Sequence, residues 1–290
     1  MSNKTDKILA WSCFGRNYLL DFSQTLVMGI INITPDSFSD GGLFFSPDKA
    51  LELAERHLAE GADLLDLGAE TTRPGSLPTP PHEEWRRLEP VLKALVARKD
   101  CPPISVDTNK SEVAEKALAA GASIVNDIFA GRNDPLIFDV AARHGVPVIL
   151  MHMQGEPRTM QIEPHYDDVV AEVKAFLIER AEAAMRAGVL KERIILDPGL
   201  GFGKNSIHNL TLLNRFDQVI PEGFHSLMAL SRKAFLGHVT NHKDPLGRDP
   251  ATSAATAVAV AKGAEMIRVH NVAPNRDAAM VGLAIRRENC

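Results

Sequence analysis

Short apolar runs that each stop at a polar or charged residue recur along this chain. A short, continuous apolar run is typical of a strand that is buried in a parallel sheet. In a barrel of parallel strands every strand points the same way, so the residues that end the runs would meet on one face, where such barrels build their active sites. The residues that end the runs are Asn32, Asp66, Asp107, Asn126, His152, Asp197, the group Ser231, Arg232 and Lys233, and the pair Arg268 and His270.

Helical segments alternate with these runs, and each ends at a glycine. The glycine, a short turn and the next strand follow one another in a weak internal repeat, which predicts a (β/α)8 barrel, that is, a TIM barrel of the α/β class. An open doubly wound sheet is the alternative, but the first run lacks the Gly-x-Gly-x-x-Gly turn of a dinucleotide-binding sheet. The segments run from Pro47 to Gly61, Asn109 to Gly121, Asp167 to Gly188 and Ala251 to Gly263.

The chain shows no linker that would divide the barrel, so we expect one barrel domain over residues 27–290. Residues 1–26 would form a short N-terminal extension. Within it, Gly15 separates two partly apolar segments, which predicts a small hairpin that caps the bottom of the barrel.

Composition excludes several classes of protein. The net charge is −5, so no strongly basic surface exists to attract nucleic acid or an anionic membrane, and no apolar stretch is long enough to span a bilayer. The three cysteines, Cys13, Cys101 and Cys290, are far apart and odd in number. They fit a reducing compartment better than a disulfide framework. We therefore expect a cytoplasmic protein with neither nucleic acid nor membrane as a partner.

Two strand-to-helix connections, residues 33–45 and 69–82, are unusually long. Connections of this length in a compact domain are commonly lids or binding loops. We interpret them as lids that close over the site late in the reaction cycle. Plain surface loops are the alternative.

Asp107, Asn126 and Asp197 end three different strands and together offer hydrogen-bond acceptors plus one amide. A carboxylate can accept from two parallel N–H donors, and the flat edge of a pterin or a guanine presents such a pair. The alternative is that each side chain only caps the barrel. We favour a ligand for the three together, because buried unpaired carboxylates are costly.

Arg268 and His270 alternate on the last strand and therefore point to the same side. With Asn32 they could hold a polyanion such as pyrophosphate, since the fork of donors on arginine suits phosphate oxygens. Asn32 also suits Mg²⁺, which usually binds through few protein atoms plus phosphate oxygens. For Arg268 taken alone, a structural salt bridge is an equal alternative.

Lys233 could be a Schiff-base nucleophile or a hydrogen-bond donor to a ring, and acidic neighbours that keep it charged would favour the donor role. Met151 could line a flat aromatic ligand. We expect His152 to have a packing role and His57 to lie on the solvated face of its helix. The glycine-rich segment from Asp197 to Lys204 resembles a phosphate cradle, although it is not a Walker motif.

At this point the motifs, taken in order, resemble the dihydropteroate synthases. The match covers most of the chain and is specific as a set. The position of Thr71 is usually serine in that family, and both residues carry a hydroxyl. The matching segments are 28–42 (MGIINITPDSFSDGG), 70–75 (ETTRPG), 105–108 (SVDT), 125–128 (VNDI), 150–155 (LMHMQG), 196–204 (LDPGLGFGK), 231–237 (SRKAFLG) and 268–270 (RVH).

The resemblance implies a reaction that joins p-aminobenzoate to 6-hydroxymethyl-7,8-dihydropterin pyrophosphate, giving 7,8-dihydropteroate and pyrophosphate in folate synthesis. It also implies Mg²⁺, a homodimer and competition by sulfonamide inhibitors. In the implied mechanism, charge on the departing pyrophosphate is stabilised while the ring supports a cation.

The resemblance also distributes roles over the site. It implies that the pterin is bound by Asp107, Asn126, Met151, Asp197, Lys233 and Arg268. It implies that Phe38, Thr72, Arg73, Pro74, Phe202 and Ser231 form the p-aminobenzoate region. Asn32, Arg268 and His270 would hold the pyrophosphate, with Asn32 on the metal. The residues assigned to catalysis are Asp36, Asp40, Lys233, Arg268 and His270.

Three other functions compete with this interpretation. A non-catalytic pterin-binding relative would lack the pyrophosphate or loop residues, which are present here. A methyltetrahydrofolate-dependent methyltransferase would not carry the Thr-Arg-Pro-Gly and Ser-Arg-Lys segments. A Schiff-base aldolase centred on Lys233 would form an adduct that borohydride traps.

Overall fold

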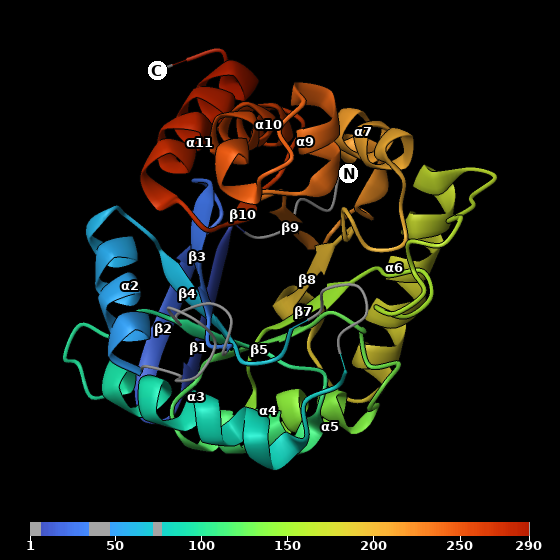
Figure 1. The fold of residues 1–290 in the computed structure, drawn as a ribbon. Helices are drawn as coiled ribbons and strands as arrows, with labels where there is room; N and C mark the ends of the chain where they lie inside the picture. The colour runs from blue at the N-terminus through green and yellow to red at the C-terminus, as the bar shows by residue number, and fades with distance from the viewer. Residues whose placement is uncertain (1–6, 35–46, 72–76, 290) are drawn as a thin grey trace.

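Parallel strands close into a barrel, and helices form a ring around it (Figure 1). The computed structural model describes residues 7–34, 47–71 and 77–289. β10 pairs with β3 to close the ring, which confirms the (β/α)8 barrel and excludes an open sheet. In chain order, the barrel strands are β3 (Leu26–Asn32), β4 (Leu64–Gly68), β5 (Ile104–Asp107), β6 (Ile124–Asp127), β7 (Val148–Met151), β8 (Ile194–Asp197), β9 (His225–Ala229) and β10 (Met266–Val269).

Helices connect each strand to the next, so all strands point the same way. The helices are α2 (Pro47–Ala59), α3 (Pro81–Val96), α4 (Ser111–Ala119), α5 (Leu136–His144), α6 (Val169–Arg186), α7 (Ser206–Asn214), α8 (Phe216–Val219), α9 (Ala234–Thr240), α10 (Asp249–Ala261) and α11 (Val272–Arg287). Two 3₁₀ turns, η1 (Lys191–Arg193) and η2 (Pro245–Arg248), precede β8 and α10.

The predicted helix ends have the expected local causes. Asp168 begins α6, where its carboxylate accepts hydrogen bonds from the backbone N–H groups of Val170 and Ala171. Gly121 and Gly263 follow α4 and α10 with φ of 111° and 112°, a region that side chains disfavour. The repeat of helix, glycine, turn and strand is therefore confirmed in the backbone.

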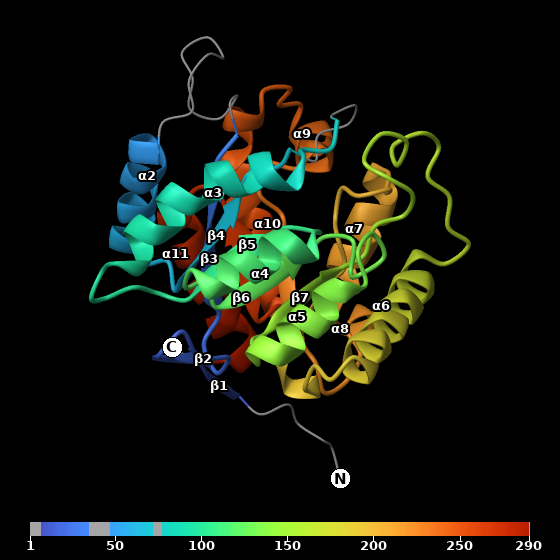
Figure 2. The ribbon, with the colours of Figure 1, turned by 90° about the horizontal axis from the view of Figure 1, so that it is seen from below.

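The hairpin predicted in the N-terminal extension is present. Strands β1 (Ile8–Cys13) and β2 (Arg16–Asp21) pair antiparallel and lie at one end of the barrel (Figure 2). The Trp11 indole N–H donates to the carbonyl of Ser123, which directly precedes β6, over 3.0 Å. The Phe22 ring stacks on His225 at the start of β9. The hairpin thus packs on the amino-terminal ends of the strands, opposite the end where their polar residues lie.

The prediction for His57 is wrong. Its side chain is buried on the inner face of α2, and its Nε2 lies 3.2 Å from the carbonyl oxygen of Ile30. Gly29 makes room for this ring, because a Cβ at Gly29 would lie 2.8 Å from the His57 Cδ2 atom.

Within the described part of the chain, no helix combines the length and the apolar character needed to cross a membrane.

Candidate active site

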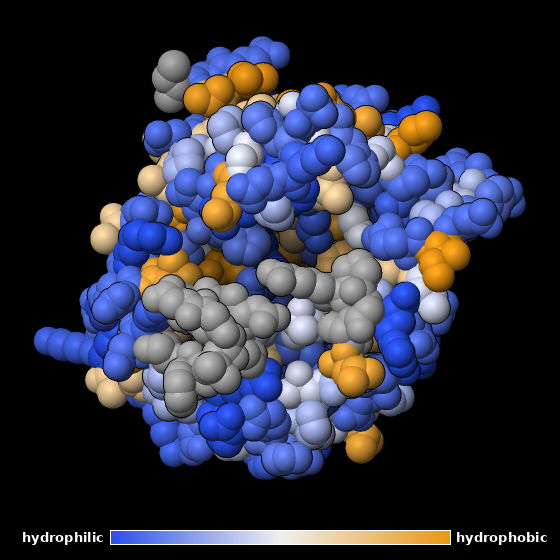
Figure 3. All heavy atoms as spheres, in the orientation of Figure 1, coloured by the Kyte–Doolittle hydropathy of each residue, from blue (hydrophilic) through white to orange (hydrophobic). Residues whose placement is uncertain are grey.

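The carboxyl ends of the barrel strands surround a cavity, which is visible as a hollow in the centre of the face shown in Figure 3. Every predicted site residue that lies within the described ranges lines this cavity. They are Asn32, Asp107, Asn126, Met151, Asp197, Phe202, Ser231, Lys233, Arg268 and His270. Most of the residues that end the runs therefore meet in one continuous site, but Asp66, His152 and Arg232 do not line the cavity. The role of each lining residue stays a prediction.

Six predicted residues lie outside the described residues, together with most of the first long connection and part of the second. They are Asp36, Phe38, Asp40, Thr72, Arg73 and Pro74. The lid interpretation accordingly stays a prediction.

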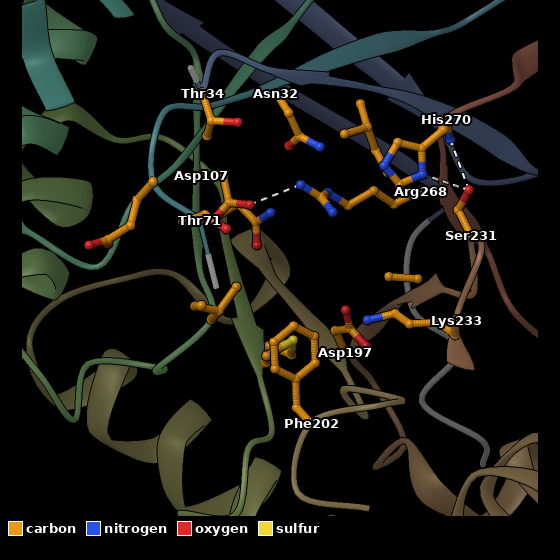
Figure 4. Close-up of a pocket in the computed structure, with 16 residues that line it drawn as sticks. Asn32, Thr34, Thr71, Asp107, Asp197, Phe202, Ser231, Lys233, Arg268 and His270 are labelled. Atoms are coloured by element: carbon orange, nitrogen blue, oxygen red, sulfur yellow. Dashed lines mark hydrogen bonds and ion pairs between the residues drawn. The ribbon is translucent and has the colours of Figure 1, made fainter. Parts of the chain in front are cut away.

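Arg268 is held by two carboxylates. Its Nε donates to Asp66 Oδ2 over 2.6 Å, and one terminal nitrogen donates to Asp107 Oδ2 over 2.8 Å (Figure 4). Burial alone would lower the pKa of Arg268, but the two carboxylates outweigh it and the pKa is raised. The guanidinium therefore stays charged and fixed in orientation.

Asp107 and Asp197 approach the cavity from opposite sides (Figure 4). Burial raises the pKa of Asp107 to about 7, against the attraction of Arg268. Burial also raises the pKa of Asp197 to about 6, although the Gly199 N–H donates to this carboxylate over 2.7 Å. Both carboxylates are thus poised to gain from a ligand that supplies N–H donors.

Lys233 points toward Asp197 (Figure 4), and its Nζ lies 4.2 Å from the centre of the Phe202 ring. Burial lowers the pKa of Lys233 to about 8, and Asp197 opposes this shift. The amine is therefore mostly protonated at neutral pH, which favours the donor role over the Schiff-base role.

His270 is a neutral donor in this site. Burial, together with the charges of Arg268, Arg232 and Lys233, lowers its pKa to about 3. Ser231 Oγ accepts from the His270 backbone N–H over 3.0 Å and lies 2.9 Å from Nδ1 (Figure 4). When the Ser231 hydroxyl donates to Nδ1, the ring proton lies on Nε2, which can then donate to a ligand.

The phosphate-cradle interpretation of the glycine-rich loop is wrong. The N–H groups of Gly199 and Gly201 already donate to Asp197 and to Asn209 Oδ1. Lys204 is buried beneath the loop and does not line the cavity. Its Nζ contacts His152 Nδ1, the Gly199 carbonyl and the Phe202 carbonyl at 2.8, 3.0 and 3.0 Å. The loop is held by the protein and presents Phe202 to the cavity.

The sequence argument names Asp66 among the strand ends but assigns it no role in the site. The pattern places it at the end of its apolar run, but β4 continues to Gly68, so Asp66 lies inside the barrel beneath the cavity. The signal available in the sequence was its position between Leu65 and Leu67, because a charged residue within a buried strand requires a partner.

Comparisons with known proteins agree with this geometry. A family model described as pterin binding enzyme matches residues 28–270. The dihydropteroate synthase of Synechocystis sp. is 44% identical over 249 residues, which cover 86% of this chain and 86% of that protein. That of Haemophilus influenzae is 44% identical over 265 residues, covering 91% of this chain and 95% of that protein.

Solved structures are similar over nearly the whole chain. A Xanthomonas albilineans dihydropteroate synthase with 4-aminobenzoic acid has a TM-score of 0.87 at 45% identity, covering 96% of this chain and 98% of that chain. The Xanthomonas protein in complex with 7,8-dihydropteroate has a TM-score of 0.84 at 43% identity, with coverage of 96% and 99%. A Yersinia pestis dihydropteroate synthase with a sulfonamide drug has a TM-score of 0.88 at 40% identity, with coverage of 97% and 100%.

Proposed function

The chain belongs to the family of pterin-binding enzymes, and we infer from this membership and from the cavity that it catalyses dihydropteroate synthesis. It is a transferase of folate biosynthesis that condenses 6-hydroxymethyl-7,8-dihydropterin pyrophosphate with p-aminobenzoate. The products are 7,8-dihydropteroate and pyrophosphate. The observation that carries this conclusion is the meeting of three acceptor-bearing strand ends with Lys233 and Arg268 in one cavity.

The acceptors suit the donor-rich edge of the pterin. In our proposal Asp107, Asn126 and Asp197 accept from the ring N–H groups, and Lys233 donates to the opposite polar edge. Met151 and Arg268 would contact the faces of the ring. Because Asp107 and Asp197 are negative when deprotonated, they would also favour positive charge that develops on the ring and its methylene carbon.

Bond breaking at the methylene carbon needs stabilisation of the departing anion. We propose that Arg268 and the Nε2–H of His270 receive the pyrophosphate as the carbon–oxygen bond breaks and its electron pair leaves with oxygen. The amine of p-aminobenzoate then supplies the pair for the new carbon–nitrogen bond and loses one proton. This sequence requires no covalent intermediate with the enzyme.

Mg²⁺ fits the residues on this side of the cavity. Asn32 supplies an amide oxygen near Arg268 and His270, and Mg²⁺ commonly binds through one or two protein atoms plus phosphate oxygens. Such a site needs no cluster of acidic ligands. Within residues 7–34, 47–71 and 77–289, no group of three or more His, Cys, Asp or Glu side chains is placed to hold a metal ion. When bound, the ion would supply charge neutralisation for the leaving group.

A further part of the cavity lining suits the arylamine. We propose that Phe202 and Ser231 border the p-aminobenzoate, with Ser231 next to His270. Phe38, Thr72, Arg73 and Pro74 would complete the pocket, and Asp36 and Asp40 would contribute from the first connection. The complex of a Yersinia pestis relative with a sulfonamide drug supports the binding of such drugs by this chain.

The decisive test of the pterin assignment is Asp197→Asn. This change replaces one acceptor by a donor that faces ring N–H groups, so we expect pterin affinity to fall by about 100-fold or more. Pterin binding would be measured by calorimetry, and turnover by pyrophosphate release with each substrate and Mg²⁺ omitted in turn.

Asp63→Asn is the matched control for that test. Asp63 also accepts one backbone N–H over 2.7 Å, from Val27, and it pairs with Arg276 over 2.6 Å. It precedes β4 at the opposite end of the barrel from the cavity. Near-normal pterin affinity in Asp197→Asn, or an equal loss in Asp63→Asn, would refute the assignment. A borohydride-trapped adduct on Lys233 would instead favour the aldolase.

We also propose a homodimer in the cytoplasm. Apolar side chains on the outer helices support an interface, since Met280, Val281 and Ile285 of α11 are 62%, 56% and 62% exposed. Cys13 and Cys101 are unpaired thiols, which supports a reducing compartment. Sedimentation equilibrium of the wild type and of Val281→Asp would test the interface, because a charge there should yield monomers.

A further inference from the structure

Asp66 lies directly beneath the proposed pterin site without lining the cavity. In the sheet register Asp66 pairs with Ser105, whereas Asp107 pairs with Gly68, so Asp66 occupies the inward-facing layer one step below Asp107. Its side chain is 0% exposed. A carboxylate buried so deeply must find donors, and those it finds belong to two residues of the site.

The first of these is Asn126. Its amide nitrogen lies 3.2 and 3.4 Å from the two Asp66 oxygens. An ionised carboxylate only accepts hydrogen bonds, so the amide must turn its NH₂ group toward Asp66. This leaves Oδ1 as the Asn126 atom available to a ligand in the cavity. An asparagine side chain can present either its oxygen or its NH₂ group to a ligand, and the neighbouring groups decide which of the two faces it.

The second is Arg268. The 2.6 Å bond from its Nε to Asp66 fixes the base of the guanidinium, while a terminal nitrogen donates to Asp107. When Asp107 shares its acceptor capacity with a ligand, the bond to Asp66 still holds Arg268 in place. The remaining guanidinium donors are then free to meet a leaving anion.

We propose that Asp66 is a positioning residue that makes Asn126 an acceptor toward the pterin and orients Arg268, without touching the substrate itself. This rests on the proposed function of the cavity. It predicts that the acceptor set formed by Asp107, Asn126 and Asp197 depends on a side chain outside that set.

Asp66→Asn tests the proposal with little change in shape. The new amide keeps an oxygen at the Oδ2 position for Arg268 and places an NH₂ at the Oδ1 position, 3.4 Å from the Asn126 amide nitrogen in the wild type. Two NH₂ groups then face each other, which favours rotation of the Asn126 amide and presentation of its own NH₂ to the ligand. We expect the pterin dissociation constant to rise about tenfold or more, while the KM for p-aminobenzoate stays within about twofold. A purely structural role would move both constants or neither.

The reciprocal change gives the sharper readout. In Asp66→Asn/Asn126→Asp the donor and the acceptor exchange places, so the carboxylate introduced at position 126 again turns a bare oxygen toward the ligand. We expect this double variant to bind pterin about fivefold or more tighter than Asp66→Asn alone. The proposal is overturned if the double variant binds pterin no tighter than the single variant does, provided that thermal melting shows both proteins to be folded.

Asp127→Asn is the matched control. Asp127 is 1% exposed on β6, but its recorded partners are the backbone N–H groups of Phe129 and Gly131. We expect its pterin affinity to stay within about twofold of wild type. An equal loss in this variant would attribute the effect to burial and overturn the proposal.

Two further measurements keep the test independent of variant folding and of the proposed function. Neutron diffraction from wild-type crystals in D₂O should place the amide deuterons of Asn126 on the atom that faces Asp66, and deuterons on the cavity side would overturn the proposal. If wild type forms no dihydropteroate, the proposed function fails. If wild type turns over and Asp66→Asn binds pterin equally well, only the role of Asp66 fails.

Discussion

At the scale of single residues, burial sets the protonation of the site. Asp197 has a pKa raised by burial to about 6, so in the free protein it is protonated below that pH and ionised above it. A ring that donates N–H groups binds the ionised form. Binding at low pH must therefore expel a proton, and affinity falls as pH decreases through the pKa.

We accordingly expect pterin affinity to be nearly constant above pH 8 and to fall by about tenfold for each unit below about pH 6. The slope should exceed one if Asp107, whose pKa burial raises to about 7, must also lose a proton. Calorimetry in buffers with different ionisation enthalpies would count the released protons. An affinity that is flat between pH 5 and 8 would contradict this reasoning.

Residue-scale prediction from the sequence succeeded where a residue at a strand end faces the cavity, and it failed where a contact partner lies far away in the chain. Asn32, Asp107 and Asp197 were found because each directly ends an apolar run. His57 was misplaced because its burial depends on the missing side chain of Gly29, and no local pattern reveals that contact.

At the scale of elements, the loop between β8 and α7 shows how the sequence marks a segment without revealing its purpose. Its glycines do permit a close approach, since a Cβ at Gly199 would collide with the His152 carbonyl oxygen. The group that approaches the loop so closely is therefore part of the protein and not a ligand. Lys204, which the sequence pattern places in a phosphate cradle, supports the loop from beneath.

Lys204→Met should therefore loosen the loop that carries Phe202. The change leaves buried acceptors without a donor, at about 1 to 3 kcal/mol for each. We expect a lower melting temperature and a several-fold higher KM for p-aminobenzoate, with pterin affinity less affected. Lys191→Met is the control, because Lys191 is exposed and lies over the ring of Phe224. An unchanged KM would show that Phe202 does not need this support.

At the scale of the whole molecule, the two ends of the barrel have separate tasks. The carboxyl ends of the strands hold the site, and the amino ends hold the hairpin of β1 and β2. The overall fold was predictable because repeated helix, glycine and strand units close in only a few ways. The docking contacts of the hairpin were not predictable, because they depend on the assembled barrel.

Trp11→Ala should separate these tasks. Trp11 is 4% exposed, stacks on Tyr18 and donates to Ser123, so its loss should lower the free energy of unfolding by about 3 kcal/mol or more. Substrate constants measured well below the melting temperature should stay as in wild type. A large change in pterin affinity would mean that the two ends are coupled through the barrel.

The buried pairing beneath the cavity has a consequence for how this enzyme can vary over generations. Four side chains on four strands are joined to one another by hydrogen bonds, namely those of Asp66, Asn126, Asp107 and Arg268. A single codon change at any of them leaves at least one of the others without a hydrogen-bond partner, so we expect viable replacements to require paired changes. A compound designed to occupy that half of the cavity would accordingly leave a growing population few one-step routes to resistance.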